Sequence, residues 1–67
     1  MVKKETHWYD VSLPSNPSII GSYRIIPGSM VEVEYRAIYR KAQYTGSPLS
    51  TVHQLLRELY REEERQY

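Results

Sequence analysis

The chain has 67 residues, and its nine Lys and Arg against eight Asp and Glu give a formal net charge of +1. This length predicts one small domain over residues 1–67 with a thin core, and 40% hydrophobic with 25% charged residues is the composition of a folded chain. Cysteine is absent, which excludes disulfides and thiolate zinc sites, and no apolar run reaches the ~18 residues of a membrane span, so we expect a soluble cytoplasmic protein.

Two strands are expected in the first half of the chain. Residues 6–13 consist largely of strand-favouring types. The turn signal over 14–17, Pro-Ser-Asn-Pro, closes this run, and a second strand follows over 19–26. Gly21 weakens the middle of that strand or marks a bulge. Pro-Gly-Ser at 27–29 predicts the next turn, because Pro presets φ and Gly accepts a positive φ.

Residues 30–44 fit two periodicities equally well. With a period of two only Ile38 breaks the alternation, and with a period of 3.6 only Val33 falls outside the apolar stripe. Residue types decide between the two patterns. The β-rich types predict a strand over 30–36, and the helix formers that follow predict a short helix over 37–44.

The last third of the chain predicts an amphipathic helix from about 48 to 64. Pro48 is acceptable in a first helical turn, and four apolar residues recur at spacings of three and four: Val52, Leu55, Leu56 and Leu59. The expected fold is therefore a small α+β single domain. It has an N-terminal antiparallel β-hairpin or three-strand meander, followed by a short helix and this C-terminal amphipathic helix.

Groups that could form a catalytic or metal site are few. His7 and His53 are the two imidazoles, and His53 lacks a second ligand four residues away on its helix. Glu32 and Glu34 would share a strand face, where solubilising charge is commoner than an acid–base pair. We therefore expect no enzymatic activity, no metal and no cofactor.

One local pattern, over residues 38–57, suggests a specific kind of binding. Residues 38–57 resemble a DNA-binding helix-turn-helix, with a small residue at Ala42, a glycine at Gly46 and apolar residues at Val52 and Leu55. In that family the glycine ends the first helix in the left-handed conformation, and the apolar pair packs back on it. The resemblance implies a non-catalytic DNA-binding protein, such as a small transcriptional regulator, that acts as a dimer.

The resemblance also implies which residues would contact DNA. Side chains at or near the exposed face of the second helix would read the groove, and three basic side chains would hold phosphates. The groove set is Ser47, Ser50, Thr51, His53, Gln54 and Arg57, and the phosphate set is Arg36, Arg40 and Lys41.

Two other families compete with this reading. Ser22-Tyr-Arg-Ile-Ile-Pro27 followed by two helices looks like a ribbon-helix-helix repressor, in which Ser22 and Arg24 would read bases from a dimeric ribbon. The chain also resembles the small KTSC domains, a meander followed by a helix with no assigned chemistry. That resemblance depends on Ile20-Gly-x-Tyr23, Val31-Glu-Val-Glu-Tyr-Arg36, Tyr44-x-Gly-x-Pro48 and Val52-x-x-Leu-Leu56.

A function of a different class is also open. The chain has seven Tyr, one Trp and no Phe. Tyr is suited to an interface because its ring can be buried while its hydroxyl remains hydrated. The acidic run 62–64 would repel phosphate. The alternative to DNA binding is therefore a small protein-binding adaptor or inhibitor, of the kind a phage or mobile element encodes, that uses a Tyr-rich surface.

Overall fold

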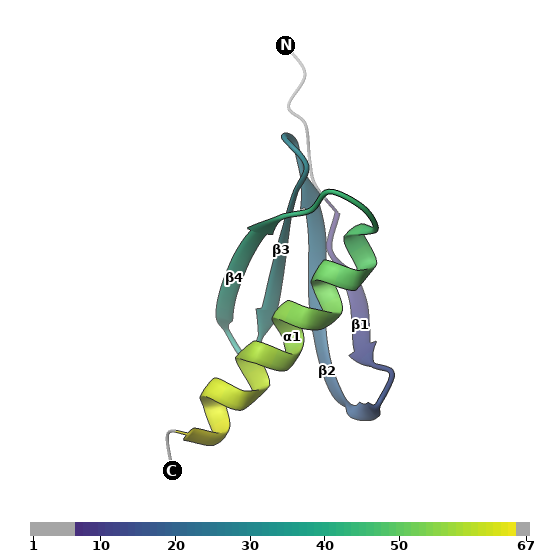
Figure 1. Cartoon of the computed structure of the whole chain (residues 1–67). Helices are drawn as coiled ribbons and strands as arrows, with labels where there is room; N and C mark the ends of the chain where they lie inside the picture. Colours follow the sequence, from purple (N-terminus) through teal and green to yellow (C-terminus); the bar gives the residue numbers. More distant parts are fainter. Residues whose placement is uncertain (1–6, 66–67) are drawn as a thin grey trace.

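The computed structural model describes residues 7–65, in which four strands precede one C-terminal helix (Figure 1). The elements are β1 (Tyr9–Leu13), β2 (Asn16–Ile26), β3 (Met30–Tyr35), β4 (Ile38–Gln43) and α1 (Pro48–Arg65). Each strand pairs antiparallel with its neighbour in sequence, so the sheet is a meander in the order β1-β2-β3-β4. Residues 1–6 and 66–67, the ends of the expected domain, lie outside the described part, as does the first residue of the strand expected over 6–13.

The short helix expected over 37–44 is wrong, because these residues form β4 and its flanks. The described chain therefore has four strands rather than two or three, and one helix rather than two. Tyr35 pairs with Ile38, so Arg36 and Ala37 make a two-residue hairpin turn, with φ of 52° and 66°. Two central residues with positive φ define a type I′ turn, which normally contains Asn or Gly. Arg36 and Ala37 are neither Asn nor Gly, so their residue types give no signal for this turn.

The same turn explains why the alternation breaks at Ile38. A two-residue turn places Tyr35 and Ile38 directly opposite one another, so the residues that face α1 change from odd numbers on β3 to even numbers on β4. The break is the hairpin itself, and both halves of 30–44 are strand. The C-terminal helix expected at about 48–64 is confirmed as α1.

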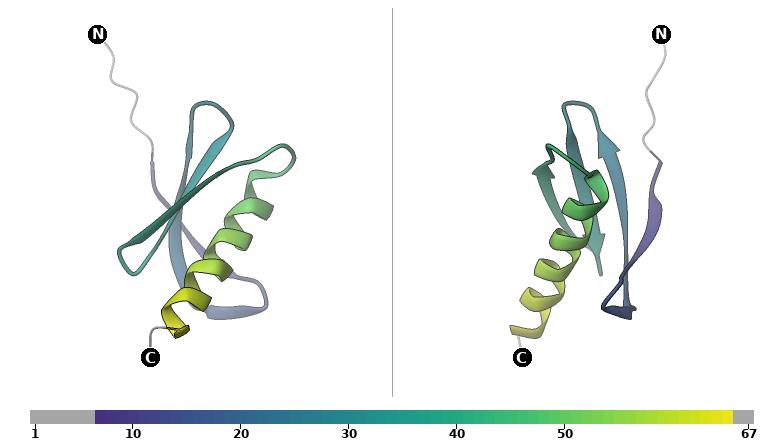
Figure 2. Two further views of the ribbon diagram at one scale, coloured as in Figure 1. Left: turned by 60° about the vertical axis from the view of Figure 1, so that its left-hand side comes forward. Right: turned by 45° about the vertical axis from the view of Figure 1, so that its right-hand side comes forward.

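The core lies between α1 and one face of the sheet. α1 runs diagonally across that face, and no described element covers the opposite face, here called the open face (Figure 2). The buried core residues come from both layers, the sheet and the helix: Leu13, Ile19, Val31, Val33, Tyr35, Val52, Leu55, Leu56 and Leu59.

Gly21 allows α1 to approach the sheet closely. It pairs in register with Val11, so the bulge considered there is absent, and the irregularity of β1–β2 lies between Ser12 and Leu13 instead. A Cβ at Gly21 would lie 2.5 Å from the carbonyl oxygen of Glu34 and 3.0 Å from Cδ1 of Leu56. The glycine therefore makes room for the helix.

Candidate functional site

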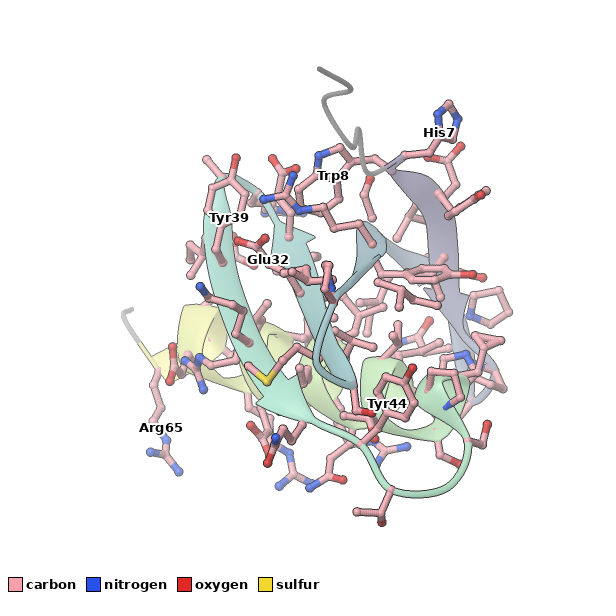
Figure 3. The ribbon with its side chains drawn as sticks, turned by 90° about the horizontal axis from the view of Figure 1, so that it is seen from above. His7, Trp8, Glu32, Tyr39, Tyr44 and Arg65 are labelled. Carbon is pink, nitrogen blue, oxygen red and sulfur yellow. The ribbon has the colours of Figure 1, made fainter. Side chains whose placement is uncertain are left out.

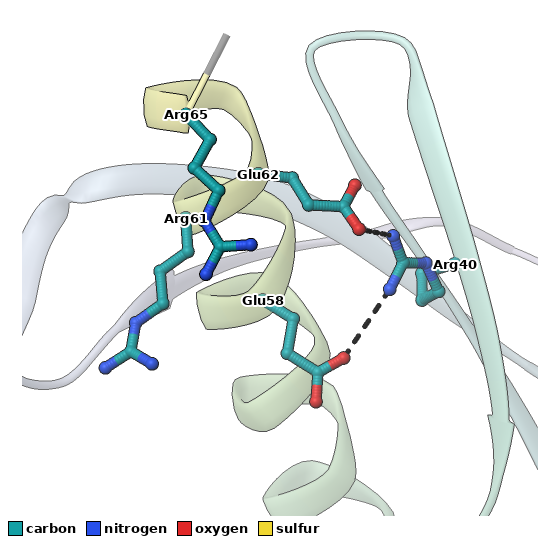
Figure 4. Close-up of a pocket in the computed structure, with 5 residues that line it drawn as sticks. All are labelled: Arg40, Glu58, Arg61, Glu62 and Arg65. Atoms are coloured by element: carbon teal, nitrogen blue, oxygen red, sulfur yellow. Dashed lines mark hydrogen bonds and ion pairs between the residues drawn. The ribbon is translucent and has the colours of Figure 1, made fainter.

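The acidic C-terminal part of α1 is bound to the β3–β4 hairpin. Arg40 extends from β4 to α1, with its Nη2 2.5 Å from Oε2 of Glu62 and its Nη1 3.6 Å from Oε1 of Glu58 (Figure 4). Arg36 in the turn donates from Nη1 to Oε2 of Glu63 at 2.7 Å. These glutamates therefore fasten the last turns of the helix to the sheet.

Two tyrosines extend this contact. The ring of Tyr35 is buried and meets that of Tyr60 edge-on, with 6.4 Å between the centroids. Burial raises the pKa of the Tyr35 phenol, and the neighbouring Glu63 carboxylate raises it further. The Tyr60 hydroxyl donates to Oε2 of Glu64 at 2.8 Å, and this hydrogen bond raises the pKa of Tyr60. The last acidic residue of α1 in the described chain is thus also engaged.

The nine residues predicted to contact DNA do not come together on one surface. Arg36 and Arg40 are held in ion pairs with α1, while Lys41 lies on the open face, opposite Glu32 in the strand register. The remaining six are in the loop before α1 or along α1: Ser47, Ser50, Thr51, His53, Gln54 and Arg57. Of these, Thr51 and His53 are half-buried and the other four are exposed.

The expected first helix of the helix-turn-helix is β4, so α1 has no preceding helix to pack against within residues 7–65. The left-handed conformation expected at Gly46 is also wrong, since among the described glycines the positive φ is that of Gly28, 91°. A contact with DNA by any of the nine residues stays a prediction.

The open face carries a cluster that the sequence did not reveal, the open-face cluster of Trp8, Arg24, Glu32 and Tyr39. Figure 3 labels Trp8, Glu32 and Tyr39. Arg24 Nη2 lies 2.8 Å from Oε1 of Glu32, and Nε donates to the same oxygen at 2.8 Å. The Trp8 ring covers the guanidinium, whose Cζ is 4.7 Å from the ring centroid, and Tyr39 meets Trp8 edge-on at 6.1 Å. As a result Glu32 is only 9% exposed, although no element of the described residues covers this face.

Around the open-face cluster the surface is apolar and acidic. Ile20 is 60% exposed and Tyr39 53%, although both are large hydrophobic side chains. Asp10 and Glu34 share this face and make no ion pair within residues 7–65. A shallow depression of about 300 Å³ lies at the β1–β2 side, lined by Asp10, Val11, Ser12, Pro17 and Ile20.

Comparison with known proteins adds no assignment. No family model matches the sequence, and no curated protein or solved structure is significantly similar to it. The resemblances to helix-turn-helix, ribbon-helix-helix and KTSC proteins therefore stay predictions. In the described part of the chain, no group of three or more His, Asp or Glu is placed to hold a metal ion. Among the same residues, no helix is both long and apolar enough to cross a bilayer.

Proposed function

We propose that this protein is a non-catalytic adaptor that binds a protein partner on the open face of its sheet. The observation that carries this proposal is the open-face cluster, in which an ion pair lies beneath an indole ring on a face that no element of residues 7–65 covers. Trp, Tyr and Arg are the residues most enriched at the energetic centres of protein interfaces. Here all three types lie beside one another on one face of the sheet.

The open-face cluster is ordered before any partner arrives. Arg24 is fixed by Glu32 on one side and by Trp8 on the other, and Trp8 is fixed in turn by Tyr39. Immobilising a rotamer-rich side chain on association costs about 0.5–1.5 kcal/mol, and much of that cost is already met in the folded chain. This pre-organisation supports a binding role for the face.

The charges of the open face favour a basic partner segment. Among residues 7–65, three carboxylates, those of Asp10, Glu32 and Glu34, share the face with two cations, Arg24 and Lys41, which leaves one negative charge. A phosphate backbone would be repelled there. The complementary partner is a protein segment with Lys or Arg beside an apolar residue.

The depression at the β1–β2 side fits such a segment. Its walls combine the exposed side chain of Ile20 with the carboxylate of Asp10. An apolar side chain of the partner would pack on Ile20, and the adjacent cation would pair with Asp10. Apolar contact would supply most of the affinity, and the ion pair would set the orientation.

The proposal is tested by selecting peptides from a random phage-displayed library on the folded protein and measuring their affinity by fluorescence anisotropy. We expect enriched peptides that carry Lys or Arg next to an apolar residue. Tyr39→Ala and Ile20→Ser should each weaken these peptides by about tenfold or more, which is about 1.4 kcal/mol. Both side chains are more than half exposed, so both variants should melt as the wild type does.

Gln54→Ala is the matched control, because Gln54 is exposed on α1 on the other side of the molecule. Its affinity for the selected peptides should equal that of the wild type. If no peptide is enriched, or if enriched peptides bind Tyr39→Ala as tightly as the wild type, the open face is not a protein-binding site.

A further inference from the structure

The outer face of α1 carries three arginines in a line, here called the arginine stripe: Arg57, Arg61 and Arg65. They are spaced four residues apart, so each lies about 6 Å further along the helix axis. All three are exposed, on the side of α1 opposite its buried residues. None of them makes an ion pair within residues 7–65.

The glutamates that could neutralise the arginine stripe are directed elsewhere. Glu58 lies three residues before Arg61, and Glu62 lies three residues before Arg65, a spacing that normally gives ion pairs along a helix. Both carboxylates instead turn to Arg40 on β4, as the dashed lines of Figure 4 mark. Glu58 also accepts a hydrogen bond from Gln54 at 3.5 Å, and both glutamates line a pocket with Arg61 and Arg65 without forming an ion pair with them.

The remaining nearby acid is also engaged. Glu64 accepts a hydrogen bond from the Tyr60 hydroxyl at 2.8 Å. The arginines meanwhile form two like-charge pairs four residues apart, an arrangement that destabilises a helix by itself. Arg61 and Arg65 share a shallow pocket with Glu58 and Glu62, but within residues 7–65 neither arginine forms an ion pair with them, so the guanidinium groups remain available to a polyanion.

We propose that the outer face of α1 binds the phosphate backbone of duplex DNA through Arg57, Arg61 and Arg65. The planar guanidinium suits phosphate because it donates two parallel hydrogen bonds. The three arginines follow one another along the helix, so they extend over a length that suits a chain of phosphates better than one small anion. Phosphate contacts carry no sequence information, so this binding should be indifferent to sequence.

A membrane surface is the less suitable anionic partner. Amphipathic helices that lie on bilayers bury an apolar face among the lipids. The apolar face of α1 is already buried against the sheet, and the arginine stripe continues toward the start of the helix through the polar residues Gln54 and Ser50. The stripe lies on the opposite side of the molecule from the open face, so this proposal does not depend on the protein-binding one.

The test is an anisotropy titration of a short, labelled, random-sequence duplex across a range of salt concentrations. Three phosphate contacts give a slope of log K against log salt of about −2.7, which is a loss of about 40-fold between roughly 50 and 200 mM salt. Arg61→Gln should reduce the slope to about −1.8. Lys41→Gln removes the same charge from the open face, so it should leave the slope at its wild-type value.

Circular dichroism and thermal melting establish that both variants remain folded. If Arg61→Gln and Lys41→Gln reduce the slope equally, net charge alone determines binding and the arginine stripe is not a site. Absence of binding at about 50 mM salt also overturns the proposal. So does binding to phosphatidylserine vesicles without binding to the duplex, which would assign the stripe to a membrane.

Discussion

Gly21→Ala should destabilise the fold by about 1–3 kcal/mol, the usual cost of inserting an atom into a packed region. The added methyl would lie 2.5 Å from the carbonyl oxygen of Glu34 and 3.0 Å from Cδ1 of Leu56. Leu56 has a flexible side chain that can rotate. The oxygen belongs to the backbone of β3, which is paired on both sides, so its contact is relieved only if a strand shifts.

The measurement is urea unfolding followed by circular dichroism and by the fluorescence of Trp8, the single tryptophan. In a domain of this size each kcal/mol lost should lower the melting temperature by about 4–8 °C. Both probes should report the same midpoint if the domain unfolds in one step.

Gly46→Ala is the control for this experiment. A Cβ at Gly46 would meet nothing within 4 Å, and its φ lies outside the left-handed region. Alanine there reduces the entropy of the unfolded chain, so the variant should equal the wild type or exceed it by up to about 1 kcal/mol. If Gly21→Ala keeps the wild-type midpoint, α1 does not approach β2 as closely as described, and the explanation of this glycine is wrong.

Three further substitutions test the hairpin and its link to α1. Ala37→Gly should raise the free energy of unfolding by about 0.5–1 kcal/mol, because alanine is strained at φ 66°; an unchanged melting temperature would contradict the left-handed turn. Arg40→Met should lower the free energy of unfolding by about 1 kcal/mol or less. The loss is small because its partners Glu58 and Glu62 are nearly half exposed, and exposed ion pairs contribute little. That loss should shrink at about 1 M salt, and a loss independent of salt would mean lost packing instead. The raised pKa of Tyr35 contributes stability that is present below pH 10.0 and is lost as pH rises through its folded-state value. Tyr35→Phe should therefore flatten the decline in urea midpoint above pH 10.0 relative to the wild type, and parallel declines would exclude this contribution.

The sequence predicted α1 well because its evidence is local. Val52, Leu55, Leu56 and Leu59 repeat with helical spacing, and all four are buried. The hairpin was mispredicted because its turn has no Asn or Gly and is stabilised by contacts elsewhere in the chain. Arg36 in that turn pairs with Glu63, a residue 27 positions later. The break in alternation at Ile38 was a usable signal, and a two-residue turn is its simplest explanation.

The open-face cluster could not be predicted because it depends on register. Trp8 and Arg24 meet because β1 and β2 pair with Tyr9 opposite Tyr23, and Arg24 and Glu32 are direct partners on β2 and β3. A shift of one residue in either pairing would move these side chains to opposite faces. The sequence provides the residue types for an interface, and only the pairing places them together.

The net charge of +1 conceals a separation of charge between the two sides of the molecule. Arg40 causes much of it. By pairing with Glu58 and Glu62 it joins sheet to helix, and within residues 7–65 these glutamates make no ion pair with Arg61 or Arg65 on the outer side of α1. The open face, counted over residues 7–65, has more carboxylates than cations. The two binding proposals, a phosphate backbone on the basic side and a basic protein segment on the acidic side, therefore involve separate surfaces. The two functions that the sequence left as alternatives are therefore compatible, each on its own face.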